Sequence, residues 1–342
     1  MVEGGQGHRG RHRVNVVLLG AGGFLGAHLH RGLTGAGHRV VSFAGTGAGG
    51  LDLASAPPGR IAAAVADALG DPDGTGGGAV VNAAGRAWNT DEAGMHAGNA
   101  ELPARIVRAL ALLARPPRLV QLGTVHEYGA GTTGTPTPET APPAPVTPYG
   151  RTKLLGTEAV LAAAGTGRVP GTVLRIANVA GPGAPTGSLL GSVAARLADA
   201  ARALDAAPDG GTGRTPVELR LPPLRAWRDF VDVRDVTDAV LRTLAAPLDR
   251  VSGRVINIGG GAAVHTRELV QRLVDLSGLP VRTVEETVPG APARHDTEWQ
   301  QLDITRAAAL LGWHPGHSLD HALRDLLAAS SAGNGTAGRT TR

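Results

Sequence analysis

The sequence of 342 residues contains no cysteine, only one lysine and only two tyrosines. The absence of cysteine excludes a disulfide framework, a thiolate nucleophile and a thiolate metal site, and we expect no metal centre. No apolar run reaches the roughly 18 residues that a membrane-spanning helix needs, and the N-terminal residues lack the apolar stretch of a signal peptide. We therefore expect a cytoplasmic protein without a membrane partner.

The basic residues are almost all arginine. The sequence pI is about 10.4, but the formal net charge is only +4. A guanidinium does not titrate until very high pH, so an arginine-rich chain has a high pI without a large net charge. Outside the N-terminal segment there is no run of five or more basic residues. We therefore expect no nucleic-acid partner.

Short apolar runs alternate with stretches of helical periodicity from residue 14 onward. Strands are predicted at 14–19, 38–43, 79–82, 118–122 and 171–176, and helices at 24–34, 61–69, 101–114 and 149–164. Apolar strands that alternate with helices indicate a parallel sheet covered on both faces. The predicted fold class is α/β, a Rossmann doubly wound parallel sheet with a smaller C-terminal substrate-binding lobe.

The alternation weakens past residue 178, where breaks rich in proline and glycine appear. We expect the Rossmann domain to span residues 13–177. Residues 178–329 are expected to form mainly the substrate-binding lobe, with some segments returning to the sheet. Residues 1–12 and 330–342 are predicted to be disordered tails.

A glycine-rich turn, GAGGFLG at residues 20–26, lies between the first predicted strand and the first predicted helix. Glycine allows a tight turn and a close approach to a pyrophosphate, whose charge then lies at the helix N-terminus. The turn therefore predicts a dinucleotide site, with a plain tight turn as the alternative. Its candidate cofactor-binding residues are Gly20, Gly22, Gly23, Phe24, Leu25 and Gly26.

The second predicted strand ends without a carboxylate, at Phe43 and Ala44. Dinucleotide sites often place an acid at this point to bind the ribose hydroxyls. A site that has Ala44 there can accept a 2′-phosphate, which favours NADP over NAD. The next acid, Asp52 beside Leu53, is placed to meet the adenine. The alternative for Asp52 is a helix cap or a solvated turn.

The lysine, Lys153, follows Tyr149 by four residues at the start of a predicted helix, so the two lie one turn apart on one face. A nearby ammonium stabilises phenolate, which would move the tyrosine pKa toward working pH and let it act as an acid or a base. The alternative is an ordinary exposed pair. Thr124, after the strand at 118–122, is expected at the carboxyl edge of the sheet, where ligands bind.

Together these motifs resemble the extended short-chain dehydrogenase/reductase family, in its nucleotide-sugar epimerase/dehydratase/reductase branch, over roughly residues 14–315. Gly20, Gly23 and Gly26 match the family's glycine turn. The resemblance makes Thr124, Tyr149 and Lys153 the catalytic residues. It adds the cofactor-binding residues Ala83, Ala84, Gly85 and Asn99.

In the second half of the chain, Asn178 and Arg228 resemble family residues that face the sugar diphosphate. Arginine is costly to bury without an anionic partner, and a guanidinium suits phosphate. The alternative for Arg228 is a salt bridge to Asp229 or Asp232. Arg294 is a candidate for a second phosphate contact, or a solvated loop residue.

The chain departs from the dehydratases of this branch, in which an Asp–Glu pair follows the active-site threonine. Val125 and His126 occupy those positions, so we reject a 4,6-dehydratase. His126 is expected to shape the substrate pocket or relay protons, unless it is a plain loop histidine. The missing acid at Ala44 favours a dissociable NADP(H), as in a reductase.

The resemblance implies a nucleotide-diphosphate-sugar substrate, and the expected activity is that of a dTDP-4-keto-6-deoxyhexose 4-ketoreductase in deoxysugar biosynthesis. One alternative is an NAD-dependent nucleotide-sugar 4-epimerase similar to UDP-glucose 4-epimerase. The other is a non-catalytic NAD(P)-binding sensor or scaffold. The resemblance also implies a homodimer through the helices that begin near Asn99 and Tyr149.

Overall fold

The computed structural model describes residues 13–43, 52–70, 77–88, 90–206, 216–286 and 299–333. Its largest element is a parallel sheet of six strands in the order β2-β1-β3-β4-β5-β9. The strands are β1 (Asn15–Leu19), β2 (Arg39–Phe43), β3 (Ala79–Asn82), β4 (Arg118–Thr124), β5 (Gly171–Ile176) and β9 (Val255–Ile258). The strand order reverses beside β1, which is where a doubly wound sheet opens a crevice for a ligand. The predicted Rossmann architecture is confirmed.

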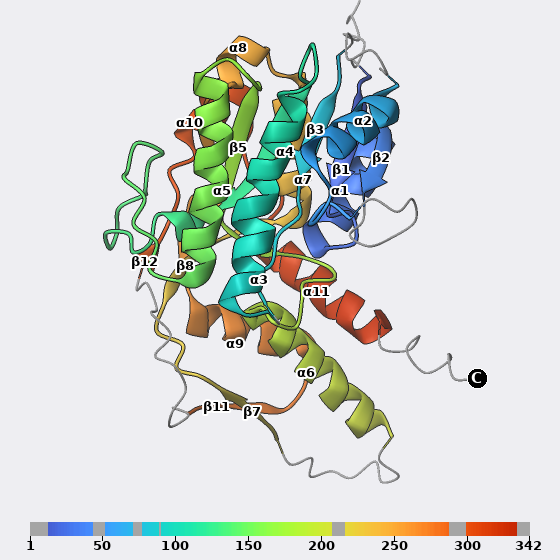
Figure 1. Ribbon diagram of the computed structural model, residues 1–342. Helices are drawn as coiled ribbons and strands as arrows, with labels where there is room; N and C mark the ends of the chain where they lie inside the picture. Colours follow the sequence, from blue (N-terminus) through green and yellow to red (C-terminus); the bar gives the residue numbers. More distant parts are fainter. Residues whose placement is uncertain are drawn as a thin grey trace, which may run out of the picture.

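Helices cover both faces of this sheet, because side chains alternate between the two faces along each strand. Val16 and Leu18 of β1 lie in the core under α1 (Phe24–Gly35) and α7 (Val233–Ala245). Val17 and Leu19 lie in the opposite core, under α2 (Pro58–Leu69), α4 (Leu102–Leu110) and α5 (Pro148–Gly165). Figure 1 shows α4 and α5 side by side across this second face.

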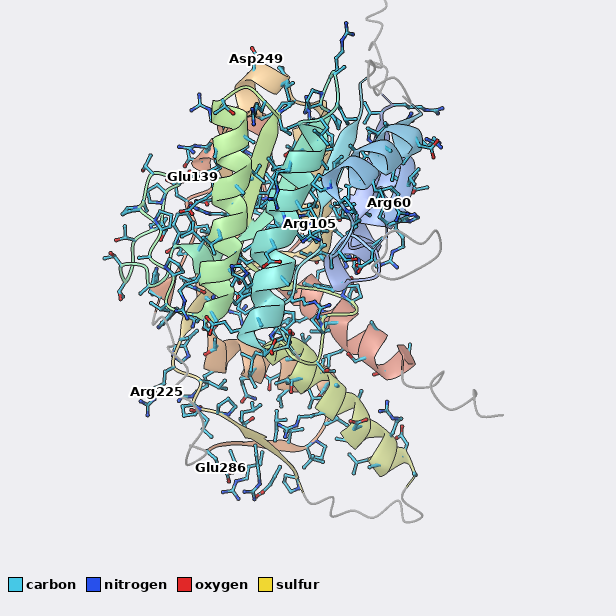
Figure 2. The ribbon with its side chains drawn as sticks, viewed as in Figure 1. Arg60, Arg105, Glu139, Arg225, Asp249 and Glu286 are labelled. Carbon is cyan, nitrogen blue, oxygen red and sulfur yellow. The ribbon has the colours of Figure 1, made fainter. Side chains whose placement is uncertain are left out.

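Charged side chains lie on the outside of these layers, such as Arg60 on α2 and Asp249 on the short helix α8 (Leu248–Val251) (Figure 2). No helix within the described ranges is long and apolar enough to cross a membrane.

The helix predicted at 101–114 differs from the structure at both ends. The helical segment begins earlier with α3 (Glu92–His96), continues as a π-helical turn, η1 (Ala97–Glu101), and ends with α4 at Leu110. Asp91 caps the start by accepting the Gly94 N–H. The prolines at 116 and 117 disfavour helix in the residues before them, which is consistent with the early end. The π turn carries Asn99, whose side chain is buried.

Segments after residue 178 form a second group of elements. β8 (Trp227–Asp232) pairs with β6 (Asn178–Ala180), β10 (Ala263–His265) and β12 (Trp299–Gln300). β7 (Val217–Leu221) pairs with β11 (Val281–Glu285). Helices α6 (Leu189–Asp205), α9 (Thr266–Ser277) and α11 (Leu319–Gly333) share a third apolar core. Figure 1 shows α6, α9 and the β7–β11 ribbon below the six-stranded sheet.

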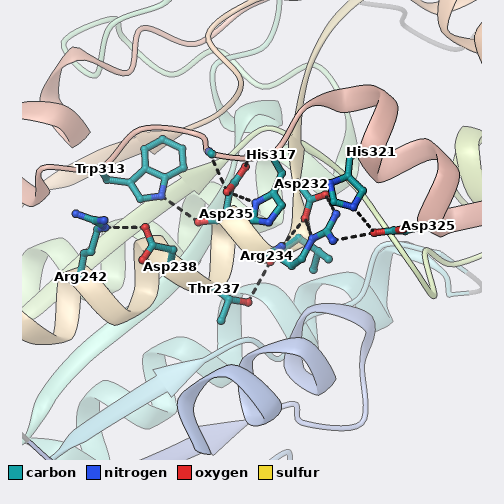
Figure 3. Close-up of polar contacts among 12 residues, drawn as sticks. Asp232, Arg234, Asp235, Thr237, Asp238, Arg242, Trp313, His317, His321 and Asp325 are labelled. Carbon is teal, nitrogen blue, oxygen red and sulfur yellow. Dashed lines mark hydrogen bonds and ion pairs between the residues drawn. The ribbon is translucent and has the colours of Figure 1, made fainter. Parts of the chain in front are cut away.

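A polar network joins α7, which packs on the sheet, to the C-terminal segment (Figure 3). Arg234 pairs with Asp232 at 2.6 Å and with Asp325 of α11 at 2.7 Å. Asp235 accepts the backbone N–H groups of Gly316 and His317. These contacts fix the end of β8 relative to the sheet, and β8 carries one of the predicted substrate residues.

Candidate active site

In the glycine turn after β1, backbone atoms lie so close together that some positions have no room for a side chain. Gly20 has φ +82°, and a Cβ on it would lie 2.6 Å from the Ala84 nitrogen. A Cβ on Gly26 would lie 2.0 Å from the Gly20 oxygen. By contrast, a Cβ on Gly22 would meet no atom of the described residues within 4 Å. Gly20 and Gly26 are therefore required for the turn itself, whereas Gly22 borders open space.

The same turn leaves the N-terminus of α1 open to an anion. The N-cap residue Gly23 offers no side-chain hydrogen bond to the first turn, and that turn holds no acidic residue. The backbone N–H groups and the positive end of the helix dipole therefore suit a phosphate. Phe24 and Leu25 begin the helix. The residues present fit the pyrophosphate of a dinucleotide.

Asp52 lies at the surface in a turn before α2. Its carboxylate accepts the Ala54 N–H at 2.9 Å and the Ser55 hydroxyl at 2.7 Å, and these bonds lower the pKa of Asp52. These bonds are those of a turn residue, which was the alternative that we gave for Asp52. The contact of Asp52 with adenine stays a prediction. The neighbouring Leu53 is buried. Ala44 lies outside the described residues.

The loop after β3 brings Ala83, Ala84 and Gly85 between the glycine turn and α5. The Ala83 N–H bonds the Leu19 carbonyl at 3.0 Å. A Cβ on Gly85 would lie 3.0 Å from Asn99 Oδ1 and 3.8 Å from Lys153 Nζ. This loop therefore connects the predicted cofactor turn to the predicted catalytic helix.

Asn99 holds that loop in place. Its Oδ1 accepts the Arg86 N–H at 2.8 Å, and its Nδ2 donates to the Arg86 carbonyl at 2.7 Å and to the Thr152 hydroxyl at 3.1 Å. The amide is thus satisfied by protein groups. A contact of Asn99 with a cofactor stays a prediction.

Thr124 and Tyr149 meet at the carboxyl end of the sheet. Thr124 ends β4, and its hydroxyl lies close enough to the Tyr149 phenol to act on the pKa of that phenol. Helix α5 begins at Pro148 after the N-cap Thr147, whose hydroxyl accepts the Gly150 N–H at 3.0 Å. A Cβ on Gly150 would lie 2.5 Å from the His126 oxygen, so the glycine lets α5 approach the end of β4 closely. This packing places the phenol beside the threonine.

Lys153 lies one turn further along α5 and is almost fully buried. Its ammonium donates to the Leu122 carbonyl of β4. Burial lowers the pKa of Lys153, and the carboxylate of Glu127 acts in the opposite direction. The predicted lowering of the Tyr149 pKa by this ammonium is wrong for this structure. Burial raises the pKa of Tyr149 to about 12, against the lowering effect of the nearby Thr124 hydroxyl.

The predicted substrate residues Asn178, Arg228 and His126 come from three separate segments and lie together. The His126 ring stands edge-on to the Tyr149 ring at 5.7 Å, and the nearby Asn178 acts to raise the pKa of His126. The Asn178 amide donates to the Asp229 carbonyl at 3.0 Å. Burial and the charge of Arg228 lower the pKa of His126 to about 4, so it is neutral at pH 7. Pairing of β6 with β8 brings Asn178 and Arg228 into this group.

The two acids that we considered as salt-bridge partners of Arg228 have other bonds. The Asp229 carboxylate accepts the N–H groups of Gly260, Gly261 and Leu302. Asp232 pairs with Arg234. Arg228 itself donates to the Trp227 carbonyl at 2.9 Å. Arg294 lies outside the described residues.

Two residues near the site were not among the sequence predictions. Gln300 is paired in register with Arg228, so both side chains leave the same face of the strands. Among the residues that the structure describes, none forms a hydrogen bond with the buried Gln300 amide. No sequence signal marks it. Glu127 completes a capping box with Thr124. The spacing of a threonine and a glutamate three residues later is a known signature of such a box and could have found it.

The family model described as "NAD dependent epimerase/dehydratase family" matches residues 16–259. The chain is 43% identical over 324 residues to the dTDP-6-deoxy-L-talose 4-dehydrogenase (NAD(P)(+)) of Kitasatospora kifunensis, covering 92% of this chain and 95% of that protein. It is 29% identical to the UDP-glucose 4-epimerase of Azospirillum brasilense, covering 91% and 90%.

Among solved structures, RMD from Pseudomonas aeruginosa complexed with NADPH superposes with a TM-score of 0.73 at 24% identity, covering 93% of this chain and 99% of that one. That likeness extends the agreement in fold to nearly the whole chain. The protein therefore belongs to the NAD dependent epimerase/dehydratase family, within the NAD(P)-dependent extended short-chain dehydrogenases/reductases that its sequence motifs indicated.

Proposed function

We propose that the protein is a 4-ketoreductase that reduces a dTDP-4-keto-6-deoxyhexose with NADPH. The observation that carries this proposal is the position of Tyr149 at the start of α5, beside the end of β4 at Thr124, 5.7 Å from the His126 ring and one helical turn from the buried Lys153. A protonated phenol is a proton donor, as carbonyl reduction requires. The two positions after Thr124 hold Val125 and His126 rather than the acids that elimination of water needs. The dehydrogenase relative acts on the corresponding sugar class.

The roles of the site residues follow from their positions. When bound, NADPH would supply the hydride for the carbonyl carbon. Tyr149 would donate its proton to the carbonyl oxygen, and Thr124 would hydrogen-bond that oxygen as negative charge develops on it. Lys153 is proposed to hold a ribose hydroxyl. The product would be an alcohol, with the hydride on its carbon and the Tyr149 proton on its oxygen.

The group of His126, Asn178 and Arg228 is proposed to bind the sugar diphosphate. The guanidinium of Arg228 supplies charge to phosphate. The neutral imidazole of His126 adds no charge of its own next to that guanidinium. The buried amide of Gln300, on the same strand face as Arg228, offers a further donor and acceptor to the nucleotide sugar.

The experiment is to follow NADPH oxidation with dTDP-4-keto-6-deoxyglucose and related 4-keto sugar nucleotides, and to run the reverse reaction with NADP⁺ and NAD⁺. The Tyr149→Phe variant is the control, and its rate should fall roughly 10²- to 10⁴-fold. Failure of the unmodified protein to oxidise NADPH with any 4-keto sugar nucleotide would reject the proposal. A preference for NADH would reject the choice of cofactor alone.

The second candidate is a nucleotide-sugar 4-epimerase, which the similarity to UDP-glucose 4-epimerase supports. An epimerase retains its cofactor through the reaction. Absorbance of the supernatant of denatured protein therefore separates the two candidates. About one equivalent of released NAD would favour the epimerase, whereas a protein purified without nucleotide favours the reductase.

We also propose a homodimer through α4 and α5. Leu155 on α5 is 46% exposed, and Leu112, just beyond α4, is 63% exposed. Apolar side chains on adjacent exposed helices favour a partner surface. Light scattering of the Leu155→Glu variant should give the monomer mass if these helices form the interface, and an unchanged dimer mass would exclude them.

A further inference from the structure

We propose that Glu127, held by Arg175, is a positioning residue that fixes Thr124 against Tyr149 from inside the protein. The proposal rests on the proposed function, because it gives Glu127 a part in that reaction. Glu127 lies behind the site, is fully buried, and is not needed for contact with substrate or cofactor.

The carboxylate of Glu127 binds the end of β4 directly. Its Oε1 accepts the Thr124 N–H at 2.9 Å. The Thr124 hydroxyl in turn accepts the His126 N–H, which completes the capping box. A Cβ on Gly123 would lie 2.7 Å from Glu127 Oε1, so the carboxylate lies against the strand backbone itself. The orientation of Thr124 therefore depends on Glu127.

Arg175 holds the carboxylate from the neighbouring strand β5. Its Nε donates to Glu127 Oε2 at 2.7 Å, and both side chains are buried. The guanidinium also lies 4.4 Å from the centre of the Tyr128 ring. The Tyr128 hydroxyl donates to Asn257 Oδ1 at 2.8 Å, on β9. Three adjacent strands, β4, β5 and β9, thus hold the position of one carboxylate.

A buried ion pair is a poor device for stability alone. Removing two charges from water costs free energy that their attraction often fails to repay, and apolar residues of similar volume are frequently as stable. The position of this pair gives it another use. Its carboxylate acts on both titratable groups of the catalytic helix, Lys153 and Tyr149, and favours the protonated form of each.

Among the described residues, Arg175 and Tyr128 lie on one side of this carboxylate, with Glu139 beyond Tyr128. Lys153 and Tyr149 lie toward the site. The imidazole of His126, beyond Tyr149, is neutral at pH 7. Loss of the Glu127 charge should therefore change the pKa values of Lys153 and Tyr149.

The composition of the chain makes the protonation of Lys153 and of Tyr149 directly measurable. Because the chain has one lysine and two tyrosines, protein labelled with ¹³C at lysine Cε and tyrosine Cζ gives one lysine resonance and two tyrosine resonances. The Tyr149→Phe variant assigns the tyrosine pair. In the Glu127→Gln variant, the pH midpoints of the Lys153 titration and of the Tyr149 titration should both move to lower pH. kcat should fall roughly tenfold, while KM for the sugar nucleotide changes little.

Glu139→Gln is the matched control (Figure 2). Glu139 is also a buried carboxylate that accepts a backbone N–H, from Asn257 at 2.9 Å, and it pairs with Arg306 at 3.6 Å. Its loss should cost similar stability without changing kcat or the Lys153 and Tyr149 midpoints. If Glu127→Gln folds poorly, the double variant Glu127→Gln/Arg175→Met removes the uncompensated guanidinium as well and should keep the low kcat and the shifted midpoints.

Unchanged midpoints with unchanged kcat in a folded Glu127 variant would overturn the proposal. So would a loss of kcat that only follows the loss of folded protein and is equalled by Glu139→Gln. The resonance titration needs no substrate. It therefore tests Glu127 even if the unmodified protein reduces no 4-keto sugar, a result that would instead reject the proposed function.

Discussion

The hydroxyl of Thr124 at the end of β4 lies beside the phenol of Tyr149 at the start of α5. The contact joins a strand of the central sheet to a helix on its face, and Thr124 acts to lower the pKa of a phenol that burial otherwise raises. Thr124 therefore has two effects in the proposed reaction. It tunes the proton donor, and it is placed to bind the oxygen that receives the proton.

Replacing Thr124 by valine keeps the volume and removes the hydroxyl. We expect kcat to fall roughly 10- to 100-fold, because a donor to the developing oxyanion is lost, and the pKa of Tyr149 to rise further. Steady-state kinetics and the tyrosine Cζ titration measure these effects. Thr124→Ser keeps the hydroxyl and should retain most of the rate. Equal rates for the valine and serine variants would show that the hydroxyl has no part in the reaction.

Gly22→Ala tests the cofactor turn without disturbing the fold. A Cβ on Gly22 meets no protein atom within 4 Å, so the melting temperature should hardly change. The methyl group would instead occupy space in which a pyrophosphate approaches the backbone. We expect the Kd for NADPH, measured by calorimetry, to rise roughly tenfold or more.

Gly35→Ala is the control for this variant, because a Cβ at the end of α1 also meets nothing within 4 Å but lies at the far end of the helix. It should leave NADPH binding unchanged. An unchanged Kd in Gly22→Ala would place the pyrophosphate elsewhere.

Five of the six strands of the main sheet were predicted. Four of these, β1, β3, β4 and β5, are buried on both faces and appear in the sequence as short, mainly apolar runs. The edge strand β2 is only partly buried, and β9 was not predicted. The glycine turn and the pair Tyr149 and Lys153 were predictable because their spacing is local. The grouping of His126, Asn178 and Arg228 was indicated only by family resemblance. It depends on the pairing of β6 with β8, and β6 has three residues, too few for a periodic signal.

The electrostatics of the site could not be predicted from the sequence. Spacing suggested that Lys153 lowers the pKa of Tyr149, whereas burial raises that pKa and the ammonium bonds the Leu122 carbonyl. The ion pair of Glu127 and Arg175 joins residues 48 positions apart through two neighbouring strands. Neither desolvation nor an ion pair between distant positions can be recognised from a short stretch of sequence, because both depend on the folded structure.

Arg228→Met tests the proposed diphosphate site. Loss of a guanidinium that binds phosphate should weaken binding of dTDP, measured by calorimetry, roughly tenfold or more. The KM for the sugar nucleotide should rise with it, and NADPH binding should not change. Arg225→Met is the matched control, because Arg225 is an exposed arginine three residues earlier (Figure 2). Equal dTDP affinity for the two variants would remove Arg228 from the site.

His126→Gln should change how stability depends on pH. The pKa of His126 is about 4 in the folded protein and about 6.5 in the unfolded chain. Between these values the unfolded chain binds a proton that the folded protein does not. The free energy of unfolding therefore falls as the pH drops from 6.5 to 4, by about 3 kcal/mol from this one group.

In the His126→Gln variant this contribution is absent. The free energy of unfolding, measured with urea at pH 7.5 and at pH 4.5, should therefore change less between the two pH values than it does in the unmodified protein. The exposed His96 serves as the control, since His96→Gln should keep the original difference. If the two variants have the same pH dependence, His126 is not held neutral by the folded protein. The proposed substrate site could then no longer include a neutral His126 beside Arg228.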